Sequence, residues 1–282
     1  MKKYITSAAV MMVAIIAGCG GGGGTTAATT VSATTTISGK VADGYLVGAQ
    51  VFLDKNNNYL LDSGEPSAIT GPDGTYTLVI APGDVGKYPV VAVALAGRTI
   101  DLDSPGQALQ NSYVLCLPKD SVSGSVSNFI SPMSTQVREL METGKYSAVQ
   151  QAMEDLRLKT GMPVGTNMLS DYMASNNAAM HSAARNMVTL MSGQTGQVMG
   201  SGANATVVDV NRYRAMVGTI FSNMSSIRGT NAQTAMDAIR NEMTPALGAM
   251  PMLTAGQPYR NMSTVFRSGV IGRVMGSIMG RL

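Results

Sequence analysis

The chain is poor in the side chains that carry most enzyme chemistry. It has a single histidine, His181, two cysteines and no tryptophan. One histidine without a cysteine partner removes most nucleophilic and zinc-dependent mechanisms. The Gly-x-Ser-x-Gly, phosphate-loop, dinucleotide-binding and Cys-x-x-Cys-His motifs are also absent. Glu154 and Asp155 are adjacent acids on a predicted helix, where neighbouring positions do not share a face. The sequence therefore predicts a protein that is not an enzyme and shows no small-molecule substrate.

Charged and aromatic side chains are scarce as well. The chain has 20 basic and 17 acidic residues, and a net charge of +3 is too small to indicate nucleic-acid binding. Aromatic residues make up 5% of the sequence, so stacking platforms for bases or sugars are not expected. Methionine is plentiful instead. Of 22 methionines, three lie at positions 1–12 and 19 lie from Met133 onward. This asymmetry predicts two different halves in a chain long enough for two modest domains.

The first 18 residues are predicted to be a secretory signal peptide. Lys2 and Lys3 precede an apolar run from Ala8 to Ala17, which is too short to span a bilayer in the mature protein. The run ends in Ile16-Ala17-Gly18-Cys19, which resembles the bacterial lipobox, where signal peptidase II cuts before the cysteine and the thiol carries a diacylglycerol. An ordinary signal peptide that happens to contain a cysteine is the alternative.

The lipobox resemblance implies lipidation at Cys19 and attachment to a membrane without a spanning helix, since each buried acyl methylene contributes about 0.8 kcal/mol. Gly20 follows Cys19, and the sorting rule of Gram-negative lipoproteins then implies the outer membrane. Periplasmic and surface-facing orientations both stay open. Residues 19–36 are rich in Gly and Thr and are predicted to form a flexible tether. Once Cys19 is lipidated, Cys116 is either a buried inert thiol or pairs with another molecule.

Residues 37–120 have the two-residue period and the Gly, Pro and Asp punctuation of a small β domain with about seven strands. Within this stretch, strands, an acidic loop and a Gly-x-Asp-Gly turn follow one another in Ser38-Gly39-Lys40-Val41, Gly48-Ala49-Gln50-Val51-Phe52-Leu53-Asp54, Asp62-Ser63-Gly64-Glu65 and Asp73-Gly74-Thr75-Tyr76. These segments resemble the transthyretin-like (carboxypeptidase regulatory-like) family, and especially the B domains of staphylococcal serine–aspartate repeat proteins. The resemblance implies an antiparallel β-sandwich that acts as a calcium-stabilised spacer or adhesin stalk without catalytic activity.

The stretch from Asp54 to Glu65 has the ligand spacing of a calcium loop. Calcium prefers six to eight oxygen ligands, which twelve-residue loops supply from positions 1, 3, 5, 7, 9 and 12. Tyr59 stands at position 6, where glycine normally takes the sharp turn, and a non-glycine residue there costs about 1 kcal/mol. We expect weak structural calcium binding, with a Kd of about 0.1–1 mM, or alternatively a polar turn without an ion. Leu61 is expected to enter the core. The predicted ligands are Asp54, Asn56, Asn58, the Leu60 carbonyl, Asp62 and Glu65.

After a Ser/Gly/Val linker from Asp120 to Ser127, residues 128–282 have a helical period and predict a methionine-rich bundle of six helices. Ser131-Pro132 is typical of a helix start. The stretch from Phe129 to Pro163 is similar to the helical part that follows a β-module in many large bacterial surface proteins, with methionine in place of the usual leucine. That resemblance implies a cell-envelope module. The predicted fold class is therefore α+β as two domains, an antiparallel sandwich at 37–120 followed by an all-α bundle at 128–282.

The methionines and the C-terminus leave alternatives open. Thioethers are soft ligands for Cu(I), so a periplasmic lipoprotein that handles soft metal ions is the alternative to a structural or interaction protein. Helical spacing and a single Met-x-Met, at Met250-Pro251-Met252, favour core packing. Near the C-terminus a small residue recurs every four positions, which allows close helix approach. This stripe is expected to dock on the bundle, or else to mediate self-association or contact with a membrane or a partner. It consists of Ser268, Gly272, Gly276 and Gly280.

Overall fold

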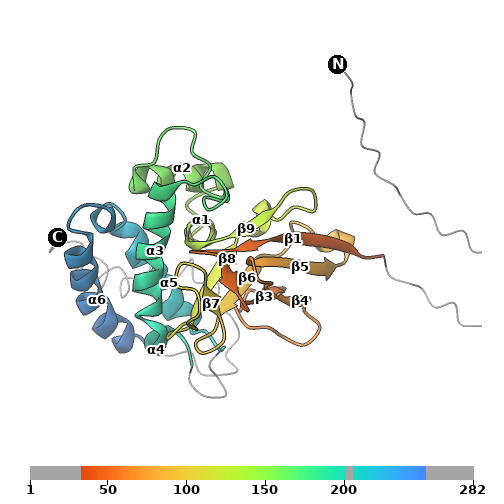
Figure 1. Cartoon of the computed structure of the whole chain (residues 1–282), viewed down its shortest axis with the longest axis horizontal. Coiled ribbons are helices and arrows are strands. Elements are labelled where there is room, and N and C mark those ends of the chain that lie inside the picture. Colours follow the sequence, from red (N-terminus) through yellow and green to blue (C-terminus); the bar gives the residue numbers. More distant parts are fainter. Residues whose placement is uncertain (1–32, 201–205, 252–282) are drawn as a thin grey trace, which may run out of the picture. The chain divides into compact units, whose positions relative to one another are not determined.

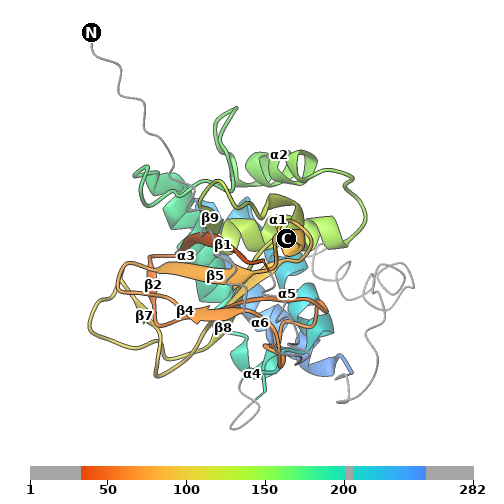
Figure 2. The same cartoon turned by 90° about the vertical axis from the view of Figure 1, so that its right-hand side faces the viewer.

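Two sheets dominate the N-terminal part of the computed structural model, which describes residues 33–200 and 206–251. One sheet has the strand order β5-β1-β9 and the other the order β4-β3-β6-β8 (Figure 1), and β2 pairs with β7 in a separate ribbon (Figure 2). The strands are β1 (Thr35–Val41), β2 (Leu46–Val47), β3 (Gln50–Leu53), β4 (Ser67–Ile69), β5 (Thr75–Ile80), β6 (Val90–Ala94), β7 (Ile100–Asp101), β8 (Tyr113–Leu117) and β9 (Asn128–Ile130).

The burial of each strand follows from what covers it. β5 buries every second residue, as a strand with one face on a core does. β6 and β8 bury all their residues, and both read in the sequence as nearly continuous apolar runs. Helix α1 (Pro132–Glu142) packs against β8. Helix α1 therefore covers the sheet β4-β3-β6-β8 at its β8 end.

Strand β9 differs from the sequence-based expectation of a linker that leads directly into helices. Its residues pair with Gly39, Lys40 and Val41 of β1 in a parallel register, whereas the other ladders are antiparallel. Gly39 permits the close approach, because a Cβ there would lie 1.8 Å from the Asn128 carbonyl oxygen. β1 itself begins at Thr35, inside the predicted tether. The chain thus returns to the first sheet before it enters α1.

Helices form most of the remaining described chain. Five lie where the sequence predicts them, and the short α4 is additional. The N-terminus of α1 carries a capping box, in which Ser131 and Ser134 each accept a hydrogen bond from the other's backbone N–H. The sixth predicted helix, from about Met262, lies outside the described residues. The helices after α1 are α2 (Val149–Thr160), α3 (Ala178–Ser192), α4 (Thr195–Val198), α5 (Val210–Ser222) and α6 (Ala232–Ala249).

Helix α1 lies between the strands and the other helices. It contacts β8 and β9 as well as α2, α3 and α5, and both cartoon views place it there (Figures 1 and 2). Buried apolar residues from Ile37 to Leu247 form one continuous cluster within a single compact unit. The described chain is thus a mixed fold of sheets and helices, compatible with the predicted α+β class. The segments that the sequence divides into two domains share one core.

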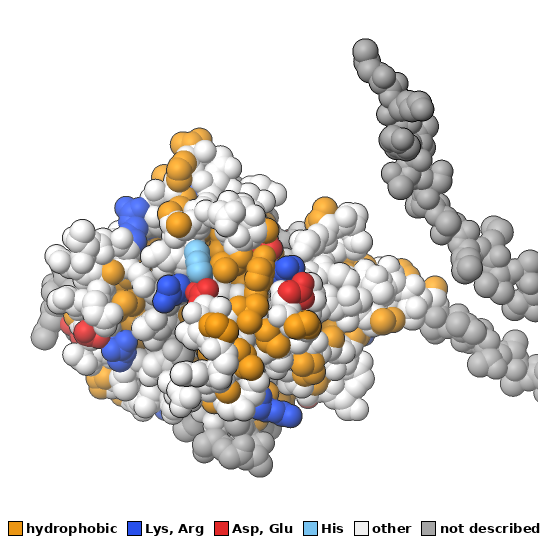
Figure 3. Space-filling view, in the orientation of Figure 1, with side chains coloured by type: hydrophobic (Ala, Val, Ile, Leu, Met, Phe, Trp, Pro, Cys, Tyr) orange, Lys and Arg blue, Asp and Glu red, His pale blue; other side chains and the backbone are white. Residues whose placement is uncertain are grey.

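The methionines of the described helical part mostly line this core. Their unbranched side chains fill irregular gaps between helices. On the face drawn in Figure 3, hydrophobic side chains gather over the strands and charged ones are scattered. The fully or nearly fully buried methionines are Met133, Met162, Met168, Met180, Met187, Met191, Met199, Met216, Met224, Met236 and Met243.

Candidate functional site

The loop that follows β3 is folded around Asp54. Its side chain is completely buried, and its two carboxylate oxygens accept the backbone N–H groups of Asn58 and Tyr59, each at 3.1 Å. In a turn the backbone N–H groups have no strand partner, so side-chain oxygens such as these accept their hydrogen bonds instead. Asp54 therefore holds the turn that its position in the sequence predicts.

Tyr59 takes the tight turn in place of glycine. Its φ of 63° lies in the left-handed region, which costs about 1 kcal/mol for a residue with a Cβ. The side chain is completely buried, and its ring lies 4.9 Å from that of Tyr213 on α5. Burial of a tyrosine ring offsets a strain of this size. Leu61, expected in the core, is only partly buried, and Tyr59 is the residue that enters the core.

Arg138 of α1 lies against the inner side of the loop. Its guanidinium carbon is 4.1 Å from the centroid of the Tyr59 ring. Nη2 donates to Asn57 Oδ1 at 2.7 Å and lies 3.7 Å from Asp54 Oδ2. Only 2% of the Arg138 side chain is exposed. Because an unpaired charge is very costly to bury, the loop carboxylate and α1 depend on each other.

Glu139 completes the cluster and extends it to α5. It accepts a hydrogen bond of 2.5 Å from the Tyr59 hydroxyl and one of 3.4 Å from Arg138 Nη1. Arg214 of α5 lies 3.4 Å from Glu139 and 3.3 Å from Glu142. Two guanidinium groups thus alternate with three carboxylates. The ion pairs join the loop, α1 and α5.

Cys116 lies at the edge of this cluster, on β8. Its Sγ accepts from Arg138 Nη1 at 3.3 Å and is 3.8 Å from the Tyr213 hydroxyl. Burial raises the pKa of the thiol to about 12, although the Arg138 charge opposes the rise. The thiol is therefore protonated at neutral pH and is a poor nucleophile. Burial likewise raises the pKa of Asp54, and Arg138 opposes this shift too.

The side chains of Asn56, Asn58, Asp62 and Glu65 lie on the outer rim of the loop, where Asn56 is exposed and the other three are partly buried. Asp62 Oδ2 accepts from the side-chain amides of Asn56 (2.6 Å) and Asn58 (2.8 Å). Glu65 accepts the backbone N–H groups of Lys55 (2.7 Å) and Asp62 (3.0 Å). The rim brings together Asn56, Asn58 and Asp62, whereas Asp54 faces Arg138.

This arrangement fits a calcium ion in part. Asn56 Oδ1 accepts the backbone N–H of Asn58 (3.2 Å) and Asn58 Oδ1 accepts that of Leu60 (2.8 Å), so the amide nitrogens face Asp62 and a bound ion would have to displace these hydrogen bonds. Calcium accepts such mixed carboxylate and amide ligands. The guanidinium beside Asp54 disfavours a cation at that carboxylate. Within residues 33–200 and 206–251, no group of three or more His, Cys, Asp or Glu side chains is placed to hold a metal.

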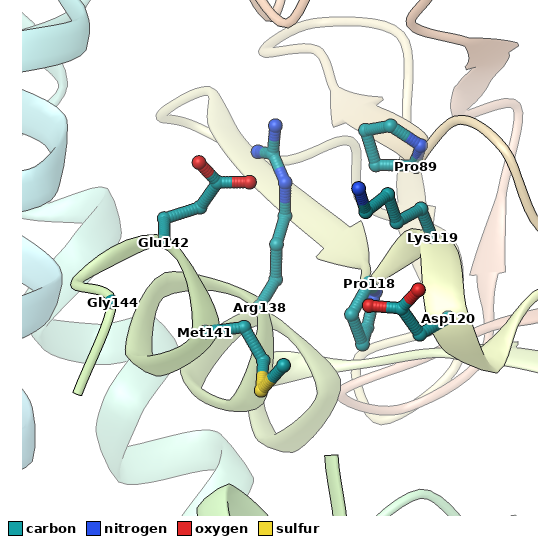
Figure 4. Close-up of a pocket in the computed structure, with 8 residues that line it drawn as sticks. All are labelled: Pro89, Pro118, Lys119, Asp120, Arg138, Met141, Glu142 and Gly144. Atoms are coloured by element: carbon teal, nitrogen blue, oxygen red, sulfur yellow. The ribbon is translucent and has the colours of Figure 1, made fainter. Parts of the chain in front are cut away.

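A cavity of about 360 Å³ opens beside the cluster (Figure 4). Arg138 and Glu142 rise into it from α1, and the Lys119 amine points toward Arg138 from the opposite wall. Asp120 also lines the wall, so two basic and two acidic side chains border the space. This balance gives no preference for a ligand of one charge sign.

The sequence gives no local signal for Arg138 and Glu139. They lie off the apolar face of α1, where polar residues are normally solvated. They are buried because β8 and α5 pack on that side of the helix. The predicted lipidation site Cys19 and the stripe at Gly272, Gly276 and Gly280 lie outside the described residues.

Comparison of the chain with protein-family models, curated proteins and solved structures gave no match. In the part of the chain that the structure describes, every helix is too short or too polar to cross a bilayer.

Proposed function

We propose that the protein is a lipid-anchored structural or interaction protein of the bacterial cell envelope, held at the outer membrane by Cys19 and without catalytic activity. The observation that carries the structural role is the insertion of Tyr59 between Arg138 and Tyr213. It fastens a β-module to a helical module through a fully buried contact. A protein that bears load or presents a surface benefits from two modules that move together.

The proposal includes a transthyretin-like sandwich for the β part. The antiparallel sheet β4-β3-β6-β8 and the antiparallel pair β1-β5 support it. The acidic loop follows β3, at the place where the resembled family carries its loop. Parallel strand β9 is an addition to that arrangement.

The proposal also includes a weak structural calcium ion at the loop rim, held by Asn56, Asn58, the Leu60 carbonyl, Asp62 and Glu65. Bound there, calcium would neutralise Asp62 and Glu65, which lie close together in the loop. Its role would be to stiffen the loop that carries Tyr59.

Lipid anchoring is tested by producing the full chain in a Gram-negative host with a radiolabelled fatty acid. We expect label on the protein and recovery in the outer-membrane fraction. Cys19→Ser should lose both, and Cys116→Ser should keep both because its thiol is buried in the core. Label that persists in Cys19→Ser, or a wild-type chain without label, would overturn the anchor. Protease treatment of intact cells then distinguishes surface display from a periplasmic orientation.

A further inference from the structure

A second buried polar cluster joins the turn Ala42–Tyr45, between β1 and β2, to the chain around α3. Tyr172, which precedes α3, donates its hydroxyl to the carbonyl oxygens of Ala42 (3.0 Å) and Asp43 (3.2 Å). Its ring stacks on His181 of α3, with centroids 5.9 Å apart. The turn is therefore held to the helical part by side chains that precede and begin α3.

Asp43 is the buried acid at the centre of this contact. It is 4% exposed, and the Tyr113 hydroxyl lies 3.1 Å from each of its carboxylate oxygens. Asp101 and Asp103 approach the same turn, since a Cβ on Gly44 would lie 2.3 Å and 2.7 Å from their Oδ1 atoms. Three carboxyl groups thus gather around Asp43 and Gly44, and a fourth, that of Asp171, accepts a hydrogen bond from the Tyr45 hydroxyl at the end of the turn.

The basic groups near the cluster are engaged with Asp103. His181 Nε2 is 2.6 Å and Arg185 Nε 3.5 Å from Asp103 Oδ2. The Arg185 side chain is 63% exposed, so solvent screens its charge. Among the described residues, no Lys, Arg or His forms an ion pair with Asp43. The groups that surround Asp43 are therefore Asp101 and Asp103, the phenols Tyr113 and Tyr172, and the two basic side chains of α3.

We propose that the contact between the Ala42–Tyr45 turn and the chain around α3 is a pH-sensitive latch, which is closed while Asp43 is protonated and whose opening releases that proton. In the closed latch an ionised Asp43 would be a buried charge beside two other carboxylates, which is unfavourable. In the open latch the same carboxylate is solvated. A cavity of about 260 Å³ lies beside the turn and is lined in part by Asp43, Asp101 and Arg185.

The direction of the pH response follows from proton linkage. Burial, and then the charge of Asp101, raises the pKa of Asp43 from 3.8 to about 8. The closed latch therefore holds a proton that the open latch releases at every pH between those two values. Opening should become about tenfold more favourable for each pH unit in that window, and should level off above about pH 8.

Hydrogen exchange of the full mature chain, followed by mass spectrometry from pH 5 to 9, tests the latch. Wild type is compared with Asp43→Asn at each pH, so that intrinsic exchange rates cancel. In peptides that cover residues 42–46 and 170–182, the ratio of wild-type to variant exchange should rise about tenfold per pH unit between pH 5 and 7. A flat ratio would overturn the proposal, as would peptides at residues 42–46 and 170–182 that exchange no faster than those from β6, because opening would then be global unfolding.

Asp171→Asn is the matched control. Asp171 accepts a hydrogen bond from the Tyr45 hydroxyl at 3.0 Å, so the variant removes a carboxylate from the same contact without removing Asp43. It should keep the wild-type pH response.

A second measurement needs no variant that could fail to fold. The ¹³C carboxyl signal of Asp43 in the wild-type protein should titrate near pH 8, and a midpoint below pH 5 would refute the latch.

Discussion

The Arg138 cluster and the Asp43 cluster both join the β part to the helical part. They differ in whether the buried acid has a guanidinium group beside it. In the first, Arg138 and Arg214 alternate with Asp54, Glu139 and Glu142. In the second, Asp43 is buried beside other acids, and the nearby His181 and Arg185 side chains contact Asp103. In the first cluster Arg138 opposes the rise in the pKa of Asp54, so that contact depends less on a proton. An uncompensated acid instead makes its contact depend on a proton.

The largest expected effect comes from breaking the compensated cluster with Arg138→Met. The change keeps an unbranched side chain but leaves Asp54 and Glu139 without their shared guanidinium. We expect a loss of about 3–5 kcal/mol in the free energy of unfolding, measured by urea denaturation, because a buried carboxylate is left unpaired. Arg185→Met, on the exposed side of the other cluster, should cost no more than about 1 kcal/mol. Equal losses would contradict the comparison.

Two tyrosine variants compare the charge of the carboxyl group that accepts a tyrosine hydrogen bond in each cluster. Tyr59→Phe removes a hydrogen bond to Glu139, and Tyr113→Phe removes one to Asp43. At pH 5.5 the first should cost about 1.5–3 kcal/mol, as for a charged acceptor, and the second about 0.5–1.5 kcal/mol, since Asp43 is then neutral. At pH 8.5 the two costs should converge. Costs that keep the same difference at both pH values would show that Asp43 does not change its charge.

Global unfolding should become more favourable as pH rises, as the opening of the latch does. For an acid whose pKa is raised in the folded state, stability falls as pH rises from the unfolded to the folded pKa. The free energy of unfolding should therefore fall by up to about 1.4 kcal/mol per pH unit between about pH 4 and 8 because of Asp43. Asp43→Asn should remove this contribution, and the exposed-site variant Asp73→Asn should retain it. Identical pH profiles for wild type and Asp43→Asn would exclude the raised pKa.

The sequence predicts the local features of the strands, helix and loop around these clusters. The run at β6, the alternation of β5 and the capped start of α1 are each visible in a few consecutive residues. The loop at Asp54 was also predictable, including the sharp turn at position 6. Tyr59 counted against the loop as a replacement for glycine, yet it serves as the buried anchor, and only its tertiary surroundings show why.

The partners across the chain could not be predicted. Arg138 and Asp43 look like ordinary surface charges, one on a helix and one in an Asp-Gly turn. Their burial depends on β8, α3 and α5, which are far away in the sequence. Strand β9 was missed for the same reason, because three residues in a Ser-rich stretch form a strand only when β1 is beside them.

The smallest expected effect is the stabilisation by calcium at the outer rim of the loop that begins at Asp54. Calcium at ten times its Kd should stabilise the fold by about 1.4 kcal/mol, or about 3–5 °C in Tm for a domain of this size. Thermal melting in EDTA and in 5 mM calcium measures the shift. Asp62→Asn combined with Glu65→Gln should abolish it, while Asp73→Asn, an exposed acid outside the loop, should leave it unchanged. No shift for the wild type would mean that the loop is a polar turn held by its own hydrogen bonds. A shift that survives the double substitution would place the ion elsewhere, because the rim would then lack its two carboxylates and the third, Asp54, is already paired with Arg138.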